Sequence, residues 1–425
     1  MSPFSADVAA ALPGPDWLKS RRIAAADRAL AAAFPTEAEE VWRYSRIGEL
    51  DLDRYALVDP TRPAGVAPDA IAAAVRATQT LIPSRAAFVM VVDGQVVHHE
   101  IDDALAARGF RVGAPADDAS LGEVMLEAPD VYAELNTAFA TSPIVVEVPD
   151  GLRITAPVVV ASFIASDGLA TLPRLVVRVG ADSEVTVLDH HSSADIAALT
   201  LPVAELDVGA GGSLRYLAVN QLGHRVWQIA SQVARGGASS SMLVANVALG
   251  GDYARVRTDA RLDGRAASGD QLAAYFGEQH QMHDFRTLQD HAAPKTRSDL
   301  LFKGAVGGRA RSVYSGLIRV RKEAPGTTAF QTNRNLKLSE GAWADSVPNL
   351  EIDTNDVRCS HASAVGPIDP EQRFYLESRG VPPDRAEELI VNGFFTEVLE
   401  RLPIPEMVAP LRAEIAAKLS RRDLV

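Results

Sequence analysis

Short runs of β-branched and large apolar residues dominate the middle of the chain, from about residue 145 to residue 351. They alternate with corners of small residues, and one type of corner recurs, because Val179-Gly180-Ala181-Asp182 resembles Val208-Gly209-Ala210-Gly211. Repeated units of strand, corner and strand are typical of a β-solenoid, in which each coil stacks its apolar face on the next. A sandwich of two sheets would also contain many short strands. The lack of a clear series of hairpins favours the solenoid.

Helical patterns precede this region. Residues 21–34 are rich in alanine and stop at a proline, and residues 36–44 begin with a Thr and a Glu at the spacing of a capping box. Further helices are expected from Asp69 to about Thr80, and over 123–140 with a restart at a proline. One hairpin is expected within 88–97, where Asp-Gly separates two β-branched runs.

Helical patterns also end the chain. Asp369-Pro370 is a typical helix start, and a second helix should run from Pro383 to about Leu402, followed by a third over 405–419. The second helix carries two adjacent apolar rows, Ile390/Phe394/Val398 and Val391/Phe395/Leu399. That stripe is wider than one packing face requires, which suggests one part in the core and one part facing a partner. The pattern predicts three domains, at residues 1–144, 145–368 and 369–425.

Composition narrows the function classes. The formal net charge is −13 and the pI about 5.2, so we expect no nucleic-acid partner. No stretch approaches the roughly 18 apolar residues of a membrane helix, and the first residues do not form a secretory signal. A single cysteine excludes an intramolecular disulfide and suits a reducing compartment. We therefore expect a cytoplasmic protein that does not enter a membrane.

Cys359 and His361 are the first candidate site. On an extended segment, residues two apart point to the same side, and a thiolate and an imidazole are both ligands for iron or zinc. The alternative is a buried, inert cysteine beside a hydrogen-bonded histidine. One thiol cannot hold a cluster alone. Any iron or cluster here must take further ligands from another chain or from exogenous sulfide.

A second candidate group is His280, His283, Asp284 and His291. The His-x-x-His spacing can bring two rings to one side of a turn, which would suit a metal ion, whereas a hydrogen-bonded polar corner gives the same pattern. The glycine-rich corners lack the ending of a phosphate-binding loop, and no nucleophile motif is present. The sequence therefore identifies no catalytic nucleophile.

A series of motifs occurs in order in the last part of the chain: Phe302-Lys303-Gly304, Tyr314-Ser315-Gly316, Gln331-Thr332-Asn333-Arg334-Asn335-Leu336, Pro348-Asn349-Leu350-Glu351-Ile352, Asp356-Val357-Arg358-Cys359-Ser360-His361, Val365-Gly366 and Phe374-Tyr375-Leu376-Glu377-Ser378-Arg379-Gly380. This series resembles the core domain of the SufB/SufD family of iron–sulfur cluster assembly proteins. Weaker similarity extends upstream to Leu135-Asn136-Thr137-Ala138-Phe139 and Glu40-Val41-Trp42-Arg43-Tyr44. The length of the chain, its single cysteine and the Trp-Arg-Tyr element are similar to the SufD branch of the family.

The resemblance implies a mainly β fold, a right-handed parallel β-helix flanked by helical domains. It implies a SufB-like partner beside this chain and a SufC-like ABC ATPase on the C-terminal helices, where Phe394, Phe395, Val398 and Leu399 would make contact. Cys359 and His361 would then lie at the interface of the two scaffolds and hold transient iron or a nascent cluster. No cofactor would be bound stably by the isolated chain, and ATP hydrolysis would belong to the partner.

Two other functions remain open. One is a SufB-like or homodimeric scaffold, and the other is a β-solenoid enzyme that acts on carbohydrate, although no paired-carboxylate motif accompanies the aromatic residues of the solenoid. The chain also departs from the family, which usually continues Cys-Ser-His with Gly-Ala-Thr. Here the sequence reads Ala362-Ser363-Ala364, and the loss of glycine restricts the backbone after His361.

Overall fold

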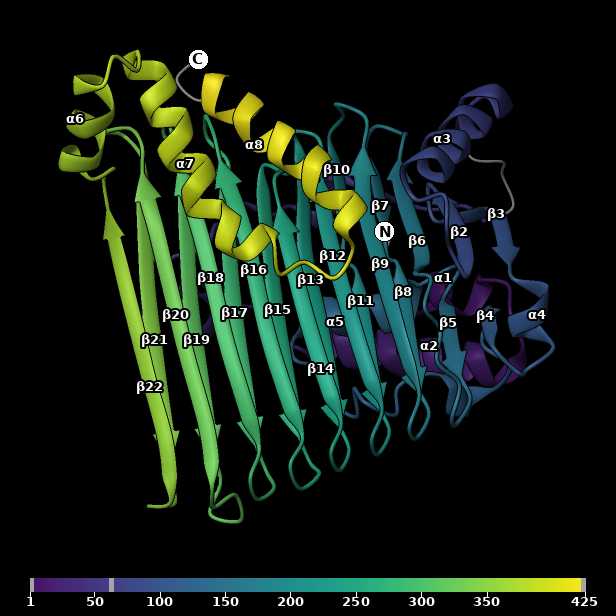
Figure 1. Cartoon of the computed structure of the whole chain (residues 1–425). Coiled ribbons are helices and arrows are strands. Elements are labelled where there is room, and N and C mark those ends of the chain that lie inside the picture. The colour runs from purple at the N-terminus through teal and green to yellow at the C-terminus, as the bar shows by residue number, and fades with distance from the viewer. Residues whose placement is uncertain (1–3, 61–64, 422–425) are drawn as a thin grey trace.

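Two long sheets that face each other form the body of the protein (Figure 1). The computed structural model describes residues 4–60 and 65–421. One sheet has the strand order β21-β19-β17-β15-β13-β11-β8-β5-β4, and the other β22-β20-β18-β16-β14-β12-β9-β6-β2-β3. Because the chain alternates between the sheets and successive coils pair in parallel, the architecture is a β-solenoid, as predicted. The parallel pairing excludes the antiparallel sandwich.

The structure places the elements as follows. The helices are α1 (Ala6–Ala11), α2 (Asp16–Ala31), α3 (Pro68–Leu81), α4 (Asp103–Ala106), α5 (Val131–Phe139), α6 (Pro370–Ser378), α7 (Pro383–Leu399) and α8 (Val408–Arg421). The strands are β1 (Ala56–Leu57), β2 (Ala87–Val92), β3 (Gln95–Ile101), β4 (Arg111–Gly113), β5 (Ile144–Val148), β6 (Val158–Ile164), β7 (Leu169–Thr171), β8 (Arg174–Val179), β9 (Glu184–Ser193), β10 (Ala198–Thr200), β11 (Val203–Val208), β12 (Ser213–Gln221), β13 (Val226–Gly236), β14 (Ser241–Ala248), β15 (Tyr253–Leu262), β16 (Ser268–Gly277), β17 (Met282–His291), β18 (Arg297–Val306), β19 (Arg311–Val320), β20 (Thr327–Lys337), β21 (Trp343–Ile352) and β22 (Val357–Gly366).

Helices α1, α2 and α5 lie on the outer face of the first sheet, whereas α3 packs against the second sheet. Trp42 and Tyr132 pack together with ring centroids 5.6 Å apart, and both join a buried cluster with Trp227 and Tyr253 of that sheet. The predicted hairpin is confirmed as β2 and β3, with Asp93 and Gly94 at positive φ as a type I′ turn requires. The segment 36–44 forms only a short 3-10 turn, Glu40–Trp42, rather than the expected helix.

The helix expected over 123–140 begins only at Val131. Asp130 caps it by accepting hydrogen bonds from the N–H groups of Tyr132 and Ala133. Upstream, the N–H groups of Gly122, Val124 and Met125 donate to the buried Glu205 carboxylate instead of to the backbone carbonyl oxygens of a helix. The prediction is therefore wrong for residues 123–130, because a tertiary acceptor takes the hydrogen bonds that a helix would need.

The C-terminal helices cover part of the second sheet, where α7 contacts β16 and β18 (Figure 1). Phe395 and Val398 are 0% exposed and Leu399 is 1% exposed, because they pack with Phe276 and Leu301 of the sheet. The expectation that these three side chains contact a partner is therefore wrong. Phe394 is half-buried, and the Lys303 ammonium lies 4.8 Å from the centre of its ring.

The last coil, β21 and β22, ends the solenoid without a strand of the described chain beyond it (Figure 1). Exposed apolar side chains gather on the strands at this end, which we call the open end: Phe330, Trp343, Val347, Ile352 and Val365. Exposed parallel edges with apolar side chains are sites where another chain can add. Within residues 4–60 and 65–421, no helix is both long and apolar enough to cross a membrane.

Candidate functional site

Cys359 and His361 lie on β22, at the open end. They pair with Ala329 and Gln331 of β20, whose side chains are buried inside the solenoid. Both candidate ligands therefore occupy the inner face of the last coil. Cys359 is half-buried against Ile318 and Ala329, whereas His361 is exposed. The arrangement places a thiol and an imidazole at the open end of the solenoid.

The strand stays regular through the residues that depart from the family pattern. Ala362, Ser363 and Ala364 pair in register with Thr332, Asn333 and Arg334 of β20. Because β22 continues to Gly366 without a shift, the missing glycine leaves the placement of His361 on the inner face intact.

The surroundings of Cys359 do not favour its thiolate form. Burial raises the pKa of Cys359, although a hydrogen bond with the backbone of Ala329 acts in the opposite direction. A thiol with a raised pKa is a weak ligand until a metal or a cation favours the thiolate. No group of three or more His, Cys, Asp or Glu side chains in the described part of the chain could hold a metal ion. Two potential ligands are therefore too few to hold a metal ion by themselves.

The other candidate group is not brought together. His280 lies exposed in a turn, while His283 and Asp284 are neighbours on β17 and point to opposite faces of that strand. His283 Nε2 lies 3.2 Å from the carbonyl oxygen of Gly250. Both ring nitrogens of His291 make hydrogen bonds, Nδ1 to Thr296 Oγ1 at 2.8 Å and Nε2 to Ser298 Oγ at 2.9 Å. This geometry is that of core histidines.

These buried histidines predict loss of stability in mild acid. Burial lowers the pKa of His283 to about 3 and that of His291 to about 4, from an ordinary value of 6.5. Below pH 6.5 the unfolded chain therefore binds protons that the native chain does not, and the free energy of unfolding falls. At pH 5.5 we expect each histidine to account for about 1 kcal/mol of that fall. Urea unfolding at pH 7.5 and 5.5 measures it.

His280, which lies in an exposed turn, provides the control for this prediction. His291→Gln should reduce the difference in unfolding free energy between the two pH values, and His280→Gln should leave it unchanged. An equal pH dependence in the wild type and in His291→Gln would contradict the assignment.

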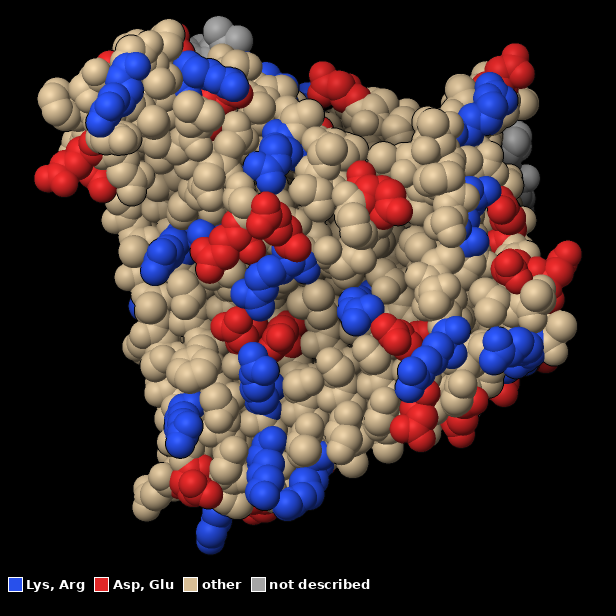
Figure 2. Space-filling view, viewed as in Figure 1, with Lys and Arg blue, Asp and Glu red and all other residues tan. Residues whose placement is uncertain are grey.

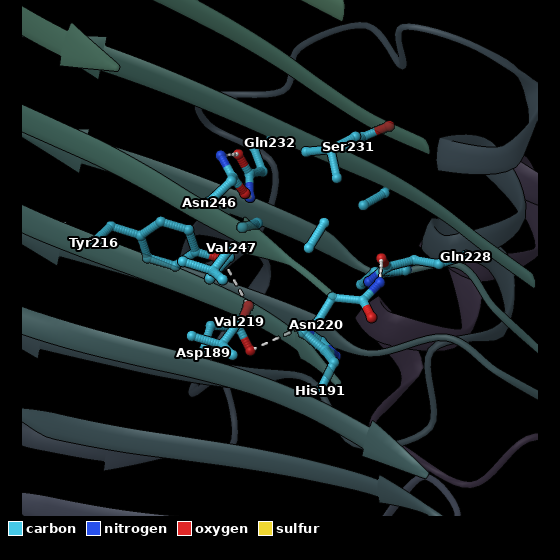
Figure 3. A pocket seen from close by; sticks show the side chains of 16 residues that line it. Asp189, His191, Tyr216, Val219, Asn220, Gln228, Ser231, Gln232, Asn246 and Val247 are labelled. Atoms are coloured by element: carbon cyan, nitrogen blue, oxygen red, sulfur yellow. Dashed lines mark hydrogen bonds and ion pairs between the residues drawn. The ribbon is translucent and has the colours of Figure 1, made fainter. Parts of the chain in front are cut away.

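A buried polar cluster inside the solenoid was not anticipated from the sequence. Tyr216 donates to Asp189 Oδ2 at 2.6 Å, and His191 Nε2 lies 3.0 Å from Asp189 Oδ1 (Figure 3). Burial acts to lower the pKa of His191, but Asp189 outweighs it, so the net shift is upward. The cavity beside these groups measures about 30 Å³, which is room for water but not for a substrate. The signal in the sequence was Asp-x-His on one strand with a tyrosine one coil later.

Comparison with known proteins identifies the family. Residues 162–394 match the model of the SUF system FeS cluster assembly, SufBD core domain. The chain belongs to the SufBD family. The matched segment extends from β6 into α7, so most of the solenoid, including Cys359 and His361, is part of the SufBD core.

Individual SufBD relatives agree with this assignment. An iron–sulfur cluster assembly SufBD family protein of Mycobacterium tuberculosis is 34% identical over 318 residues, which cover 71% of this chain and 77% of the relative. The iron–sulfur cluster assembly protein SufD of Escherichia coli is 28% identical over 410 residues, covering 92% of this chain and 90% of that protein. SufD of Bacillus subtilis is 29% identical over 289 residues, 67% of this chain and 66% of the relative. Within the family, the chain is therefore most like SufD, and its role lies in iron–sulfur cluster assembly.

Proposed function

We propose that this chain is a SufD-like scaffold subunit, which pairs with a SufB-like subunit and supports iron entry and cluster formation at their interface. The observation that carries the proposal is the position of Cys359 and His361 on the inner face of an open last coil. A cluster or its iron needs more ligands than these two side chains supply. The remaining ligands would come from the partner scaffold and from sulfide, with iron as cargo rather than as a resident cofactor.

The partner scaffold would add at the open end. Strands β21 and β22 end the two sheets, and Val347, Ile352 and Val365 on them are 37–43% exposed. Burial of such apolar side chains drives stable association. A partner of the same fold would continue both sheets and cover Cys359 and His361 at once, which excludes water from the shared site.

A SufC-like ATPase would dock on the C-terminal helices, away from the buried row of α7. The exposed apolar side chains there are Phe374 and Tyr375 of α6 and Leu389 of α7, which are 71%, 58% and 42% exposed. On the molecular face that carries these helices, charged side chains of both signs are interspersed (Figure 2). ATP hydrolysis would belong to the partner, and this chain would act in the cytoplasm as a scaffold without catalysis of its own.

Co-expression with the SufB-like and SufC-like proteins of the same genome tests the proposal. The wild-type chain should co-elute with both partners on gel filtration. Val365→Asp should reduce recovery of the SufB-like subunit at least tenfold, because it places a charge in the apolar edge, and Phe374→Asp should remove the ATPase alone. Leu126→Asp, in an 84% exposed position outside both surfaces, is the matched control. A wild-type chain that forms only a homodimer, or a Val365→Asp chain that co-elutes as the control does, would contradict the proposed pairing.

A further inference from the structure

The inner face beneath the site is unusually polar. Strand β20 places the amide side chains of Gln331, Asn333 and Asn335 inside the solenoid, each 3% exposed or less. One coil earlier, the residues in register with them are Leu300, Phe302 and Gly304 of β18. Buried amides lower stability unless their hydrogen bonds are made. The burial of each of the three amides therefore needs a physical explanation.

Two of the amides satisfy one another. Asn335 Nδ2 donates to Asn333 Oδ1 at 2.8 Å, and Tyr275 donates to Asn335 Oδ1 at 2.8 Å. Asn333 Nδ2 in turn donates to the Tyr275 hydroxyl at 2.9 Å and to the carbonyl oxygen of Phe302 at 3.2 Å. This is a closed network, which accounts for both asparagines as structural residues.

Gln331 is different. Its side chain is 1% exposed, and its Oε1 has no hydrogen-bond partner in the described chain. Its Nε2 faces the opposite sheet, where it reaches the carbonyl oxygen of Gly316 at 3.4 Å. A Cβ at Gly316 would lie 2.3 Å from this Nε2, so glycine leaves the room that the amide occupies. Because the oxygen and nitrogen of an amide point to different sides, Oε1 is turned away from Gly316.

His361 is the residue in register with Gln331 on the next strand of the sheet. Gln331 and His361 are partners in the register of β20 and β22, so their side chains stand on the same face of adjacent strands, which lie about 4.8 Å apart. His361 makes no side-chain hydrogen bond to any residue of the described chain. A neutral imidazole donates from one nitrogen and coordinates through the other, and the acceptor on the first nitrogen decides which one is free.

We propose that Gln331 is a positioning residue for His361: its Oε1 accepts one ring N–H, fixes the ring at the mouth of the solenoid and leaves the other nitrogen free for iron. This inference rests on the proposed function of His361. On this proposal, the unpartnered Oε1 of Gln331 is the acceptor for a ring N–H of His361, which gives a reason for burying this polar atom. No atom is transferred, since Gln331 acts only through the orientation and tautomer of the imidazole.

Three variants test the inference. Gln331→Met keeps the shape of the side chain but removes the acceptor, Gln331→Glu keeps an acceptor, and Gln289→Met makes the same change on β17, away from the open end, at a position that is 0% exposed. In the metal-free chain at pH 8, ¹⁵N chemical shifts of His361 should report one tautomer in the wild type and a mixture in Gln331→Met. In the reconstituted complex, Gln331→Met should weaken binding of iron(II) by about 10- to 100-fold, with rescue by Gln331→Glu.

The outcomes separate this inference from the function on which it rests. A single His361 tautomer and iron(II) affinity within twofold of wild type in Gln331→Met would overturn the inference. If His361→Ala itself left iron binding and cluster formation unchanged, the proposed function would fail instead. Thermal unfolding identifies a folding defect. We expect Gln331→Met to be at least as stable as Gln289→Met, because Gln331 loses only a 3.4 Å contact with Gly316, whereas Gln289 loses the 3.0 Å hydrogen bond that its Oε1 accepts from Gln271.

Discussion

Replacing Asp284 by asparagine is expected to lower the free energy of unfolding by about 3–5 kcal/mol. The carboxylate is 0% exposed and accepts hydrogen bonds from Arg255 Nη1 at 2.6 Å, Arg286 Nε at 2.6 Å and the Tyr253 hydroxyl at 2.9 Å. Burial acts to raise the pKa of Asp284, but the two arginines outweigh it and hold the pKa below its usual value. Asparagine would leave two buried guanidinium groups without their counter-charge.

The same change should loosen the N-terminal segment. Arg255 donates to the carbonyl oxygen of Val41 at 2.9 Å, and Arg286 donates to that of Arg43 at 2.7 Å. The guanidinium of Arg255 also lies 3.8 Å from the centre of the Trp42 ring. Asp284 therefore orients the two arginines that fasten residues 41–43 to the solenoid. Hydrogen exchange over this segment should accelerate in Asp284→Asn.

A neighbouring pair provides the control for Asp284. Asp259 forms a similar pair with Arg257 on the same sheet, but both side chains are about one-fifth exposed. Exposed pairs contribute roughly 1 kcal/mol or less, so Asp259→Asn should lose little stability in urea unfolding. Equal losses of stability in Asp284→Asn and Asp259→Asn would contradict this role of Asp284.

Replacing Lys418 by methionine is expected to release α8 at a loss of about 2–4 kcal/mol. The Lys418 side chain is 1% exposed, and its ammonium donates to Glu278 Oε1 at 3.0 Å and to Gln281 Oε1 at 2.7 Å, in the turn between β16 and β17. Methionine would leave the buried Glu278 carboxylate with two partly exposed neighbours, Arg421, whose Nε lies 2.9 Å from Oε2, and His224, whose Nε2 lies 3.5 Å from Oε1. Hydrogen exchange over 408–421 and urea unfolding measure the two effects.

The pH dependence gives Lys418 an independent signature. Burial lowers the pKa of Lys418 to about 8, from an ordinary value of 10.5. Between these two values the unfolded chain binds more protons than the native chain, so wild-type stability should rise with pH, and Lys418→Met should lack that rise. Arg401→Met, which breaks an exposed pair with Asp299, is the control. A Lys418→Met chain as stable as this control, with the wild-type pH dependence, would contradict the account.

Local signals predicted a large part of the fold. The Gly-rich corners predicted the solenoid, and Asp93-Gly94 predicted the hairpin, because a turn type depends on a few residues in sequence. The placement of Cys359 and His361 on one face followed from the period of a strand alone. These features need no knowledge of which coil lies next to which.

The remainder depended on contacts between distant segments. Phe395, Val398 and Leu399 look like a partner surface in sequence, but β16 and β18 lie beneath them. His283 and Asp284 form a plausible metal motif on a turn, but on β17 they face opposite ways, and arginines from two strands meet Asp284. The pairing of Gln331 with His361 and the lack of a partner for Gln331 Oε1 both depend on the register of the folded strands.

The central claim is that Cys359 and His361 supply half of a shared cluster-building site. The most direct test is iron and acid-labile sulfide per complex, measured after anaerobic purification of this chain with its SufB-like and SufC-like partners. The account predicts iron and sulfide in the wild-type complex, and a loss of roughly tenfold or more in both Cys359→Ser and His361→Ala, with all subunits still present. Wild-type iron and sulfide content in both variants would contradict it.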